Sequence, residues 1–526
     1  MQSWSSYCWE RGRLVRTAPR ALKVLDYPYS RYAQCGRDVR APSNMEPRTI
    51  NRTLRALFHQ LSSKSTQRIL ALLFILALAL SVRALSANFL RAHLNEPGWF
   101  PSGIYAAFDH QAQGWLDGRT SIFWIDDPAH TDAAIYPPGY PLWLAFIYTL
   151  TGSRSPAAVQ NVQWVLDAFS VLLVVGAGVT AFGWRTGFGA GGIAALWPLP
   201  ATYGAAPLAD APTSWLIVGA AWALLVAAKR RSPGWALGAG ALVGASCWLR
   251  ANAMLLVFFW ALALLLLVQV NWRRRVLLSA GVILSAMLVI APVVARNMIA
   301  FQAFVPTGLG AGTNLWEGIG ETERGAKEFG APASDSELVE QERAALNVSP
   351  GAPFDLYYPD GIRRDRERMS KALAIIARHP FWYAGTVARR MAAVMKYAGK
   401  PSGIYGSAGI NVTSRKCLPP RWQGGVVALF VNALGMFQSV LRYILLPLML
   451  VGLVLAFRLD WRTTGLLMAT VLYYLVVGSM IHTHIRYGLP MHALLTIFAA
   501  LALWRLKDLV VSRRLAILGN SESAGS

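Results

Sequence analysis

The chain has 526 residues, of which 55% are hydrophobic and only 15% are charged, and its formal net charge is +23. Soluble proteins carry about 25% charged residues, so this composition excludes an ordinary soluble domain. The apolar residues fall in runs of roughly 15–25, the length that crosses a hydrocarbon core of about 30 Å. The basic residues lie beside these runs, which favours membrane orientation over nucleic-acid binding as the reason for the charge. The sequence therefore predicts an all-α polytopic membrane protein.

Residues 1–68 are polar and rich in arginine, with no apolar run of their own. We expect a basic cytoplasmic tail without a packed core. Met45 precedes a short basic stretch and is a candidate start, which would leave residues 1–44 upstream of the native protein. The four cysteines contain no CxxC pair, so they predict neither a zinc site nor a disulfide framework.

The first apolar segment, about 69–85, is followed by a loop, 86–136, with six acidic and two basic residues. Basic residues before the segment and acidic residues after it predict a cytoplasmic N-terminus and an external loop. Ten further apolar segments follow, at about 137–152, 157–182, 187–204, 209–228, 235–249, 251–270, 276–295, 437–457, 463–481 and 490–506. We expect about 10–12 transmembrane helices, with basic cytoplasmic ends at 229–231, 273–275, 458–462 and 505–514.

Eleven crossings would leave the basic C-terminus outside, against the charge rule. Between residues 137 and 228 the rule requires an odd number of crossings, but four apolar segments lie there. The glycines and prolines of 187–204 make this the expected broken or re-entrant piece.

Residues 297–425 form a second long loop, predicted to be external. Within it, 365–378 reads as an amphipathic helix that is interrupted at His379 and Pro380. Residues 381–397 follow as a helix that suits the membrane interface. The predicted regions are a tail at 1–68, a membrane module at 69–296 with its external loop 86–136, the loop region 297–425, C-terminal helices at 426–511 and a cytoplasmic tail at 512–526.

Several short motifs stand at the predicted external ends of the helices. They are Tyr136-Pro-Pro-Gly-Tyr-Pro141, Leu249-Arg-Ala-Asn252, Ala291-Pro-Val-Val-Ala-Arg-Asn297 through Phe304-Val-Pro306, Thr313-Asn-Leu-Trp-Glu-Gly318, and Arg486-Tyr-Gly-Leu-Pro490. Together with the acid-rich first loop, this set resembles the GT-C superfamily of integral-membrane glycosyltransferases over roughly residues 69–507. The resemblance is closest to the branch that uses dolichyl- or undecaprenyl-phosphate sugars, which includes protein O-mannosyltransferases and lipid A aminoarabinose transferases. Val293 and Gly488 depart from the pattern, which has Trp and Arg there.

The resemblance implies a catalytic acid in the first external loop, and Asp109 is the best match. Many relatives place this acid a few residues earlier, where the chain has Ile104 and Tyr105. Asp210 matches a position where many relatives carry Ser-Glu, so it is a second catalytic candidate, with helix capping as the alternative. Other acids in the loop are weaker candidates: Asp126, Asp127 and Asp132.

A departing phosphate needs cations, and arginine holds phosphate through several donors. Arg296, Arg486 and Arg250, with Tyr487, are the predicted phosphate-binding residues, and anchoring to lipid headgroups is the alternative for the arginines. The predicted substrate-binding residues are Tyr136, Asn314 and Trp316.

The resemblance implies an inverting transferase that moves a sugar from a polyprenyl phosphate to an external lipid, glycan or protein. Membrane lipids are the other expected partners, and we expect no nucleic acid. His482 and His484 could form a metal pair, but no carboxylate or third histidine is adjacent in the sequence. The resemblance implies that no metal is needed, and we expect no cofactor. A transporter or flippase for a lipid-linked sugar, or an O-antigen-ligase-like enzyme, is the alternative. The expected location is a bacterial inner membrane, and the sugar and the acceptor stay open.

Overall fold

The apolar segments fold as α-helices, which satisfy their own backbone hydrogen bonds without water. The computed structural model describes residues 64–96, 104–122, 136–397, 413–481 and 484–523, with only the backbone from 513 onward. These residues belong to one compact unit that begins at Lys64. The regular elements among the described residues are helices, and no strand occurs among them. The predicted all-α fold is confirmed.

The membrane module contains α2 (Lys64–Arg91), α3 (Ile104–Leu116), α5 (Gly139–Thr151), α6 (Pro156–Phe182), α7 (Trp184–Leu196), α8 (Pro198–Gly204), α9 (Asp210–Arg230), α10 (Pro233–Leu249), α11 (Leu256–Leu267) and α12 (Trp272–Phe301). The later helices are α13 (Ala311–Gly320), α14 (Glu323–Phe329), α15 (Asp335–Ala345), α16 (Gly361–Arg378), α17 (Pro380–Val394), α18 (Gly425–Ile481) and α19 (Leu489–Ser523). Within the described residues, α2, α6, α9, α12 and α18 are each long and apolar enough to cross a membrane.

The long helix α18 is two helices joined at a kink. Asp460 has non-helical backbone angles, and its carboxylate accepts hydrogen bonds from the Thr463 amide at 3.0 Å and the Thr463 hydroxyl at 2.5 Å. Asp460 therefore caps the second half of α18. The kink separates the two apolar segments expected at 437–457 and 463–481.

The segment predicted to be broken, 187–204, is broken at Trp197. The backbone there is extended, with φ −71° and ψ 122°, and Pro198 begins α8. Arg83 of α2 donates to the carbonyl oxygens of Ala195 at 3.0 Å and Ala194 at 3.4 Å, which the break removes from the helical ladder. A buried arginine thus satisfies the exposed end of α7.

The segment 137–152 differs from the expectation, because it does not form a full-length membrane helix. It gives α5, whose 13 residues span only about 20 Å. Both the helix and its end face the first loop, since Tyr148 donates to Asp109 at 2.6 Å and Arg154 pairs with Asp117 at 2.7 Å. α5 packs against α3 and α6.

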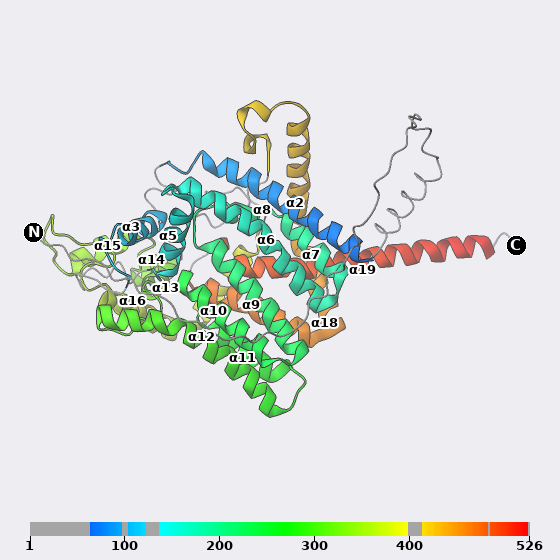
Figure 1. Ribbon diagram of the computed structural model, residues 1–526. Helices are drawn as coiled ribbons and strands as arrows, with labels where there is room; N and C mark the ends of the chain where they lie inside the picture. Colours follow the sequence, from blue (N-terminus) through cyan, green and yellow to red (C-terminus); the bar gives the residue numbers. More distant parts are fainter. Residues whose placement is uncertain (1–63, 97–103, 123–135, 398–412, 482–483, 524–526) are drawn as a thin grey trace, which may run out of the picture. The chain divides into compact units, whose positions relative to one another are not determined.

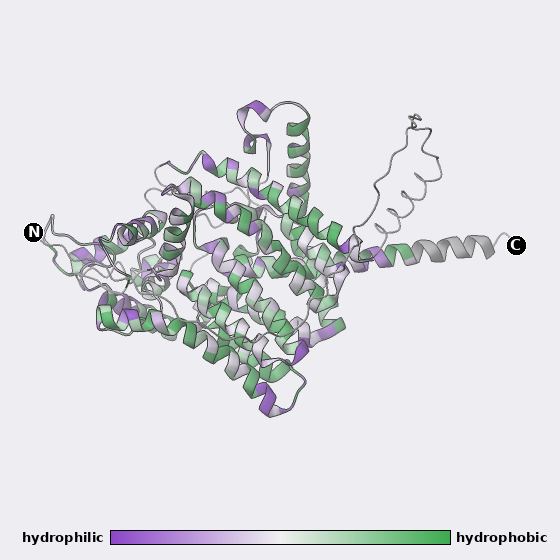
Figure 2. Ribbon diagram, viewed as in Figure 1, coloured by the Kyte–Doolittle hydropathy of each residue, from purple (hydrophilic) through white to green (hydrophobic). Residues whose placement is uncertain are grey.

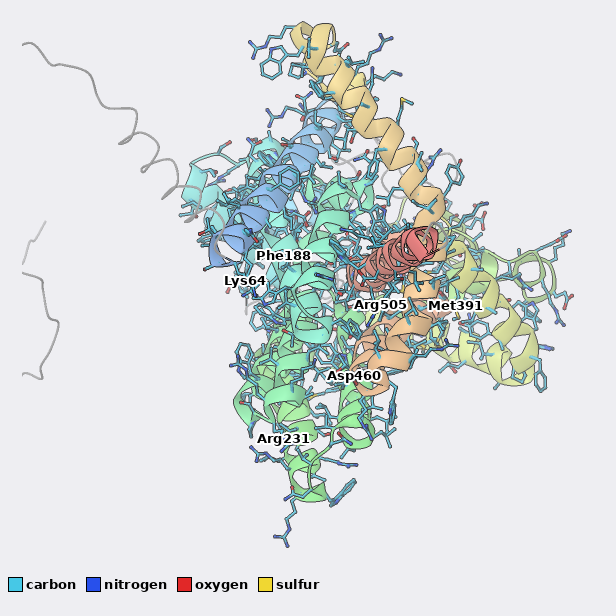
Figure 3. All side chains as sticks on the ribbon, turned by 90° about the vertical axis from the view of Figure 1, so that its right-hand side faces the viewer. Lys64, Phe188, Arg231, Met391, Asp460 and Arg505 are labelled. Carbon is cyan, nitrogen blue, oxygen red and sulfur yellow. The ribbon has the colours of Figure 1, made fainter. Side chains whose placement is uncertain are left out.

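Two of the predicted basic clusters lie together at one end of the bundle. The Arg274 guanidinium donates to the Arg231 carbonyl oxygen at 3.1 and 2.8 Å, which joins the start of α12 to the end of α9. Lys229 interacts electrostatically with Asp460 at the kink of α18. Figure 3, viewed from the right-hand side of Figure 1, labels both Arg231 and Asp460.

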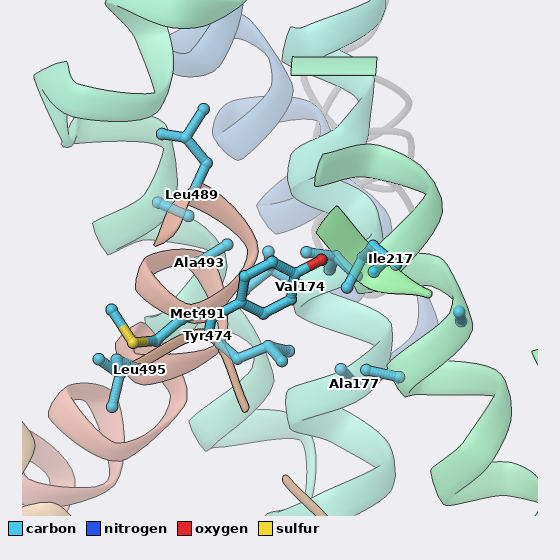
Figure 4. Close-up of a cluster of buried hydrophobic side chains, with 14 of the residues drawn as sticks. Val174, Ala177, Ile217, Tyr474, Leu489, Met491, Ala493 and Leu495 are labelled. Atoms are coloured by element: carbon cyan, nitrogen blue, oxygen red, sulfur yellow. The ribbon is translucent and has the colours of Figure 1, made fainter. Parts of the chain in front are cut away.

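The core of the bundle forms where α18 and α19 pack against α6 and α9. Figure 4 shows Val174, Ile217, Tyr474, Leu489 and Ala493 brought together from these four helices. All five are less than 9% exposed. Burial of this apolar surface holds the two halves of the chain together.

The segment between α12 and α18 folds into short helices outside this core. Figure 1 shows α13, α14, α15 and α16 gathered near α3 and α5, and Figure 2 shows hydrophilic residues concentrated in them. They have a small apolar core of their own, which includes Leu315, Trp316, Leu338 and Ala372. The predicted break between α16 and α17 at His379 is confirmed.

Candidate functional site

A cavity of about 410 Å³ lies where α3, α9 and α10 meet the connection between α18 and α19. The segment 306–311, which leads into α13, forms another wall. Six of the nine predicted site residues line this cavity: Tyr136, Asp210, Arg250, Asn314, Arg486 and Tyr487. Fold and sequence therefore bring residues from five separate parts of the chain to one place.

An ion pair between Asp210 and Arg250 forms one wall of the cavity. Asp210 stands in the first turn of α9, where the helix dipole favours a negative charge. Arg250 ends α10 in an extended conformation that turns its side chain toward α9, and its Nη1 lies 2.5 Å from Asp210 Oδ1. The Asp210 side chain is 3% exposed and that of Arg250 is 22% exposed. The arginine thus remains accessible from the cavity.

Arg486 and Tyr487 enter from a single 3-10 turn, η4 (Ile485–Gly488), between α18 and α19. Two guanidinium groups lie near the Tyr487 ring, whose centroid is 4.9 Å from Arg250 Cζ and 5.2 Å from Arg486 Cζ. Burial disfavours the Arg486 cation, but Tyr487 and Asp210 outweigh it and raise the pKa of Arg486. The site therefore holds two permanent cations beside one carboxylate.

Tyr136 and Asn314 complete the polar lining. Tyr136 follows the first loop and packs against Phe108, with ring centroids 4.8 Å apart. Burial raises the pKa of its phenol, so Tyr136 stays protonated and can donate a hydrogen bond. Asn314 lies in the first turn of α13, and its amide donates to the Gly310 carbonyl oxygen.

Asp109 does not line the cavity. Its Oδ1 accepts a hydrogen bond from the Tyr148 hydroxyl at 2.6 Å, and its Oδ2 accepts one from Gln113 Nε2 at 2.8 Å. Ile104 and Phe108 of the same helix face the cavity instead. Of Ile104 and Tyr105, where the family resemblance would place an acid, only Ile104 lines the cavity.

Arg296 and Trp316 also lie away from the cavity lining. Arg296 is 3% exposed, and it donates to the Ile122 carbonyl oxygen and to Asn297 Oδ1, both at 2.8 Å. Asn297 in turn donates to the Val305 carbonyl oxygen at 2.9 Å. This chain of bonds fixes the two loops that border the cavity. Trp316 packs in the apolar core of the α13–α17 region.

Glu317 belongs to the motif Thr313–Gly318, but no role was predicted for it from the sequence; its carboxyl group is buried. It lies one helical turn beyond Asn314 and is 6% exposed. Burial and the neighbouring carboxylate of Asp335 raise the pKa of Glu317 to about 9. Its burial depends on how α13 packs, which no local pattern in the sequence reveals.

An apolar groove of about 810 Å³ runs beside the cavity between α5, α6, α9 and α10. Leu249 belongs to the lining of both, so the groove and the cavity are adjacent. The groove is rich in tryptophan: Trp143, Trp215 and Trp248. The spacing of these residues in the sequence gave no reason to group them.

Some predicted residues lie outside the described part of the chain. They are Asp126, Asp127, Asp132 and His482. Within the residues that the structure describes, no group of three His, Cys, Asp or Glu side chains is placed to hold a metal ion.

Comparison with solved structures gives distant matches. An archaeal oligosaccharyltransferase, AglB from Archaeoglobus fulgidus in complex with an inhibitory peptide and a dolichol-phosphate, matches with a TM-score of 0.47 and 14% identity, over 87% of this chain and 52% of that chain. The Archaeoglobus fulgidus oligosaccharyltransferase tethered with an acceptor peptide matches with a TM-score of 0.47 and 12% identity, over 86% and 51%. This chain spans about half the length of those enzymes.

A search of curated proteins by sequence gives no match. The family model for dolichyl-phosphate-mannose-protein mannosyltransferases matches residues 136–298, which run from the cavity residue Tyr136 to the end of the membrane module. That stretch contains Asp210 and Arg250. Over these residues the chain is thus similar to the dolichyl-phosphate-mannose-protein mannosyltransferases, and the resemblance to GT-C-type membrane glycosyltransferases that its motifs indicated is confirmed.

Proposed function

We propose that the protein transfers a sugar from a polyprenyl phosphate, of the dolichyl or undecaprenyl type, to an acceptor on the external side of the membrane, with inversion at the anomeric carbon. The observation that carries this proposal is the meeting of Asp210, Arg250 and Arg486 in one cavity. Such a site offers cations for a departing phosphate and a carboxylate for the acceptor proton. The match to a family named for a lipid-phosphate sugar supports the same donor class.

The placement of the cavity supports its external location. α9 begins at Asp210 in the cavity and ends at the basic cluster that contains Arg231, and its 21 residues span about 31 Å. The cavity and the basic clusters are therefore at opposite ends of a membrane-length helix. Basic clusters favour the cytoplasmic side, so the cavity faces outward.

The helix contacts also support a consistent set of crossings. With α5 on the side of the first loop, the crossings between 137 and 228 are α6, the pair α7 and α8, and α9. Together with α2, α10, α11, α12, the two halves of α18, and α19, this gives ten crossings in the described part of the chain. Both basic ends then lie in the cytoplasm, and the parity conflict disappears. We expect a bacterial inner membrane as the location.

In the proposed complex, Arg486 and Arg250 hold the donor phosphate. A guanidinium presents several donors in one plane, which suits phosphate oxygens. The lipid chain lies in the apolar groove that shares Leu249 with the cavity. The phosphate then sits at the membrane surface while its lipid remains among the helices.

The reaction needs one base. The acceptor hydroxyl oxygen forms a bond to the anomeric carbon, the bond from that carbon to the phosphate oxygen breaks, and the hydroxyl proton passes to a carboxylate. The geometry favours Asp210, because it lines the cavity while both oxygens of Asp109 accept hydrogen bonds outside it. A donor phosphate that draws Arg250 away would free Asp210 Oδ1 to accept the proton. Asp109 is the alternative base.

Turnover of a radiolabelled polyprenyl-phosphate sugar by purified protein tests the proposal. Asp210→Asn keeps the shape of the side chain but removes the base, and it should lower the rate by about 10²–10⁴-fold. Asp117→Asn is the matched control, because Asp117 is a loop carboxylate that pairs with Arg119 and Arg154. If Asp109→Asn abolishes turnover and Asp210→Asn does not, Asp109 is the base. Wild-type protein that moves the lipid-linked sugar across a vesicle membrane without transferring it would support a flippase instead.

A further inference from the structure

We propose that Asp365 of α16 is a positioning residue for the donor cavity, although it does not line the cavity itself. It acts through α13, whose first turn carries the cavity residue Asn314. This inference rests on the proposed function of the cavity as the donor site. It adds a residue from the external region to the machinery that binds the donor.

The start of α13 is the link between Asp365 and the cavity. Residues 306–311 and Asn314 form one wall. The residue that precedes α13 is Gly310, with φ +102°, and it has no side chain that can cap the helix. The first amides of α13 therefore need an acceptor from elsewhere.

Asp365 provides that acceptor from a different helix. Its Oδ1 accepts hydrogen bonds from the Thr313 amide at 2.8 Å and the Thr313 hydroxyl at 3.0 Å, and its Oδ2 accepts one from the Gly312 amide at 3.3 Å. Asp365 is 7% exposed, so water is largely excluded as a competitor for these bonds. A negative charge at this end of the helix also suits the helix dipole.

A second layer of contacts holds Asp365 and α16 in place. Arg368, one turn further along α16, donates to the Thr313 hydroxyl at 2.8 Å and makes two hydrogen bonds to Glu342 of α15, at 2.7 and 2.6 Å. Arg364 adds two more bonds to Glu342, at 2.8 and 2.5 Å. These hydrogen bonds outweigh the effect of burial and lower the pKa of Glu342, so the network stays charged at neutral pH.

The packing leaves α13 little room to shift without α16. A methyl group added at Gly312 would lie 1.8 Å from the backbone oxygen of Asp365, so the two backbones are in close contact. One added at Gly310 would lie 3.0 Å from the Tyr357 hydroxyl. The wall of the cavity is thus set by α16 and its neighbours, and loss of the Asp365 cap should displace Asn314 and the segment 306–311.

The test measures kcat and the KM for the donor separately in purified full-length protein, with a radiolabelled polyprenyl-phosphate sugar. Asp365→Ala should raise the donor KM by roughly two- to thirty-fold, the range that corresponds to loss of a helix cap. The kcat should change by less than about twofold, because the wall contributes uniform binding rather than chemistry. Asp365→Asn keeps the shape and one acceptor oxygen, so it should give a smaller rise of the same kind.

Glu367→Ala is the matched control, because Glu367 is an exposed carboxylate on the same helix that pairs only on the surface with Arg363 at 3.0 Å. Arg486→Ala reports on the proposed function itself. If Arg486→Ala raises the donor KM and Asp365→Ala does not, the positioning role is wrong while the donor site stands. If neither variant changes the donor KM, the donor site is wrong. Should Asp365→Ala not fold, as judged by its thermal unfolding midpoint, an unchanged donor KM in Asp365→Asn would overturn the inference.

Discussion

Replacement of Asp167 by asparagine should strongly destabilise the protein, because Asp167 is a buried charged residue of α6. Arg83 Nε donates to Asp167 Oδ2 at 2.9 Å, and Trp215 Nε1 donates to Asp167 Oδ1 at 2.6 Å. The side chains of Arg83 and Asp167 are only 1% and 6% exposed. Asp167 of α6 thus pairs with Arg83 of the neighbouring helix α2.

The expected size follows from that burial. Asp167→Asn removes the countercharge and leaves Arg83 buried beside a neutral amide. Removal of one partner from a buried ion pair costs about 3–5 kcal/mol. The exposed pair of Arg185 and Asp508, 3.9 Å apart, is the matched comparison, because its side chains are 76% and 52% exposed. Exposed pairs contribute about 0–1 kcal/mol, so Asp508→Asn should have little effect.

Unfolding of the purified protein in detergent, followed by tryptophan fluorescence against temperature or denaturant, measures the difference. Asp167→Asn should unfold well before the wild type, and Asp508→Asn should unfold with it. The double variant Arg83→Met with Asp167→Leu should recover part of the loss, because an apolar pair has no charge to bury. Recovery should be incomplete, since Arg83 also binds the carbonyl oxygens of Ala194 and Ala195. Equal stability of Asp167→Asn and Asp508→Asn would refute this account of α2 and α6.

Three further predictions concern the donor site, the buried carboxyl group and the topology. Arg486→Lys should raise the donor KM by about one to two powers of ten, because lysine lacks the forked hydrogen-bond donors of arginine. Arg486→Ala should raise the donor KM further, and the acceptor KM should stay unchanged in both variants. Steady-state kinetics that show equal effects on donor and acceptor would contradict this prediction. Burial and Asp335 raise the pKa of Glu317 from 4.5 to about 9, so the folded protein keeps a proton that the unfolded chain releases. The stability of the fold should therefore fall as pH rises from 4.5 to 9, and thermal unfolding of Glu317→Gln should lack this dependence on pH. In a cysteine-free background, single cysteines that replace Ser102 and Ser334 should react with an impermeant reagent in intact cells, and a cysteine that replaces Ser232 should not. Labelling at only one of Ser102 and Ser334 would overturn the topology.

The positions of the helices could be predicted from the sequence wherever one run of apolar residues forms one helix. The apolar segments, the break within 187–204 and the break at His379 follow from local composition and from proline and glycine. The role of α5 did not follow, because its residues are as apolar as those of a membrane helix. Only its partners reveal its place: Tyr148 contacts Asp109, and Arg154 contacts Asp117. Contacts between distant segments decide whether a short apolar helix crosses.

The sequence allowed us to predict which helix ends contribute residues to the site. Charge patterns indicated that Arg250 and Arg486 share one side, and the structure brings them to one cavity with Asp210, which the family resemblance indicated. The direction of each side chain was not predictable. Arg296 is at a helix end like the others, but it turns toward Ile122 and supports a loop. Side-chain direction depends on the rotation of a helix about its axis, and that rotation is fixed by packing.

Polar residues inside the membrane module connect the positions of the helices with the geometry of the site. On α6, Gln160, Gln163 and Asp167 recur at helical spacing and face the broken segment that follows α7. Gln163 Nε2 donates to the Leu208 carbonyl oxygen at 3.2 Å, two residues before Asp210. A polar residue in an apolar helix is costly unless it is bonded, so this stripe has a structural purpose. The amides of Gln160 and Gln163 donate to carbonyl oxygens of residues 205–208, just before α9, and thereby fix where α9 begins. The position of the Asp210 carboxylate in the cavity is therefore set by α6, and in the proposed donor site α16 sets the wall that Asn314 and residues 306–311 form.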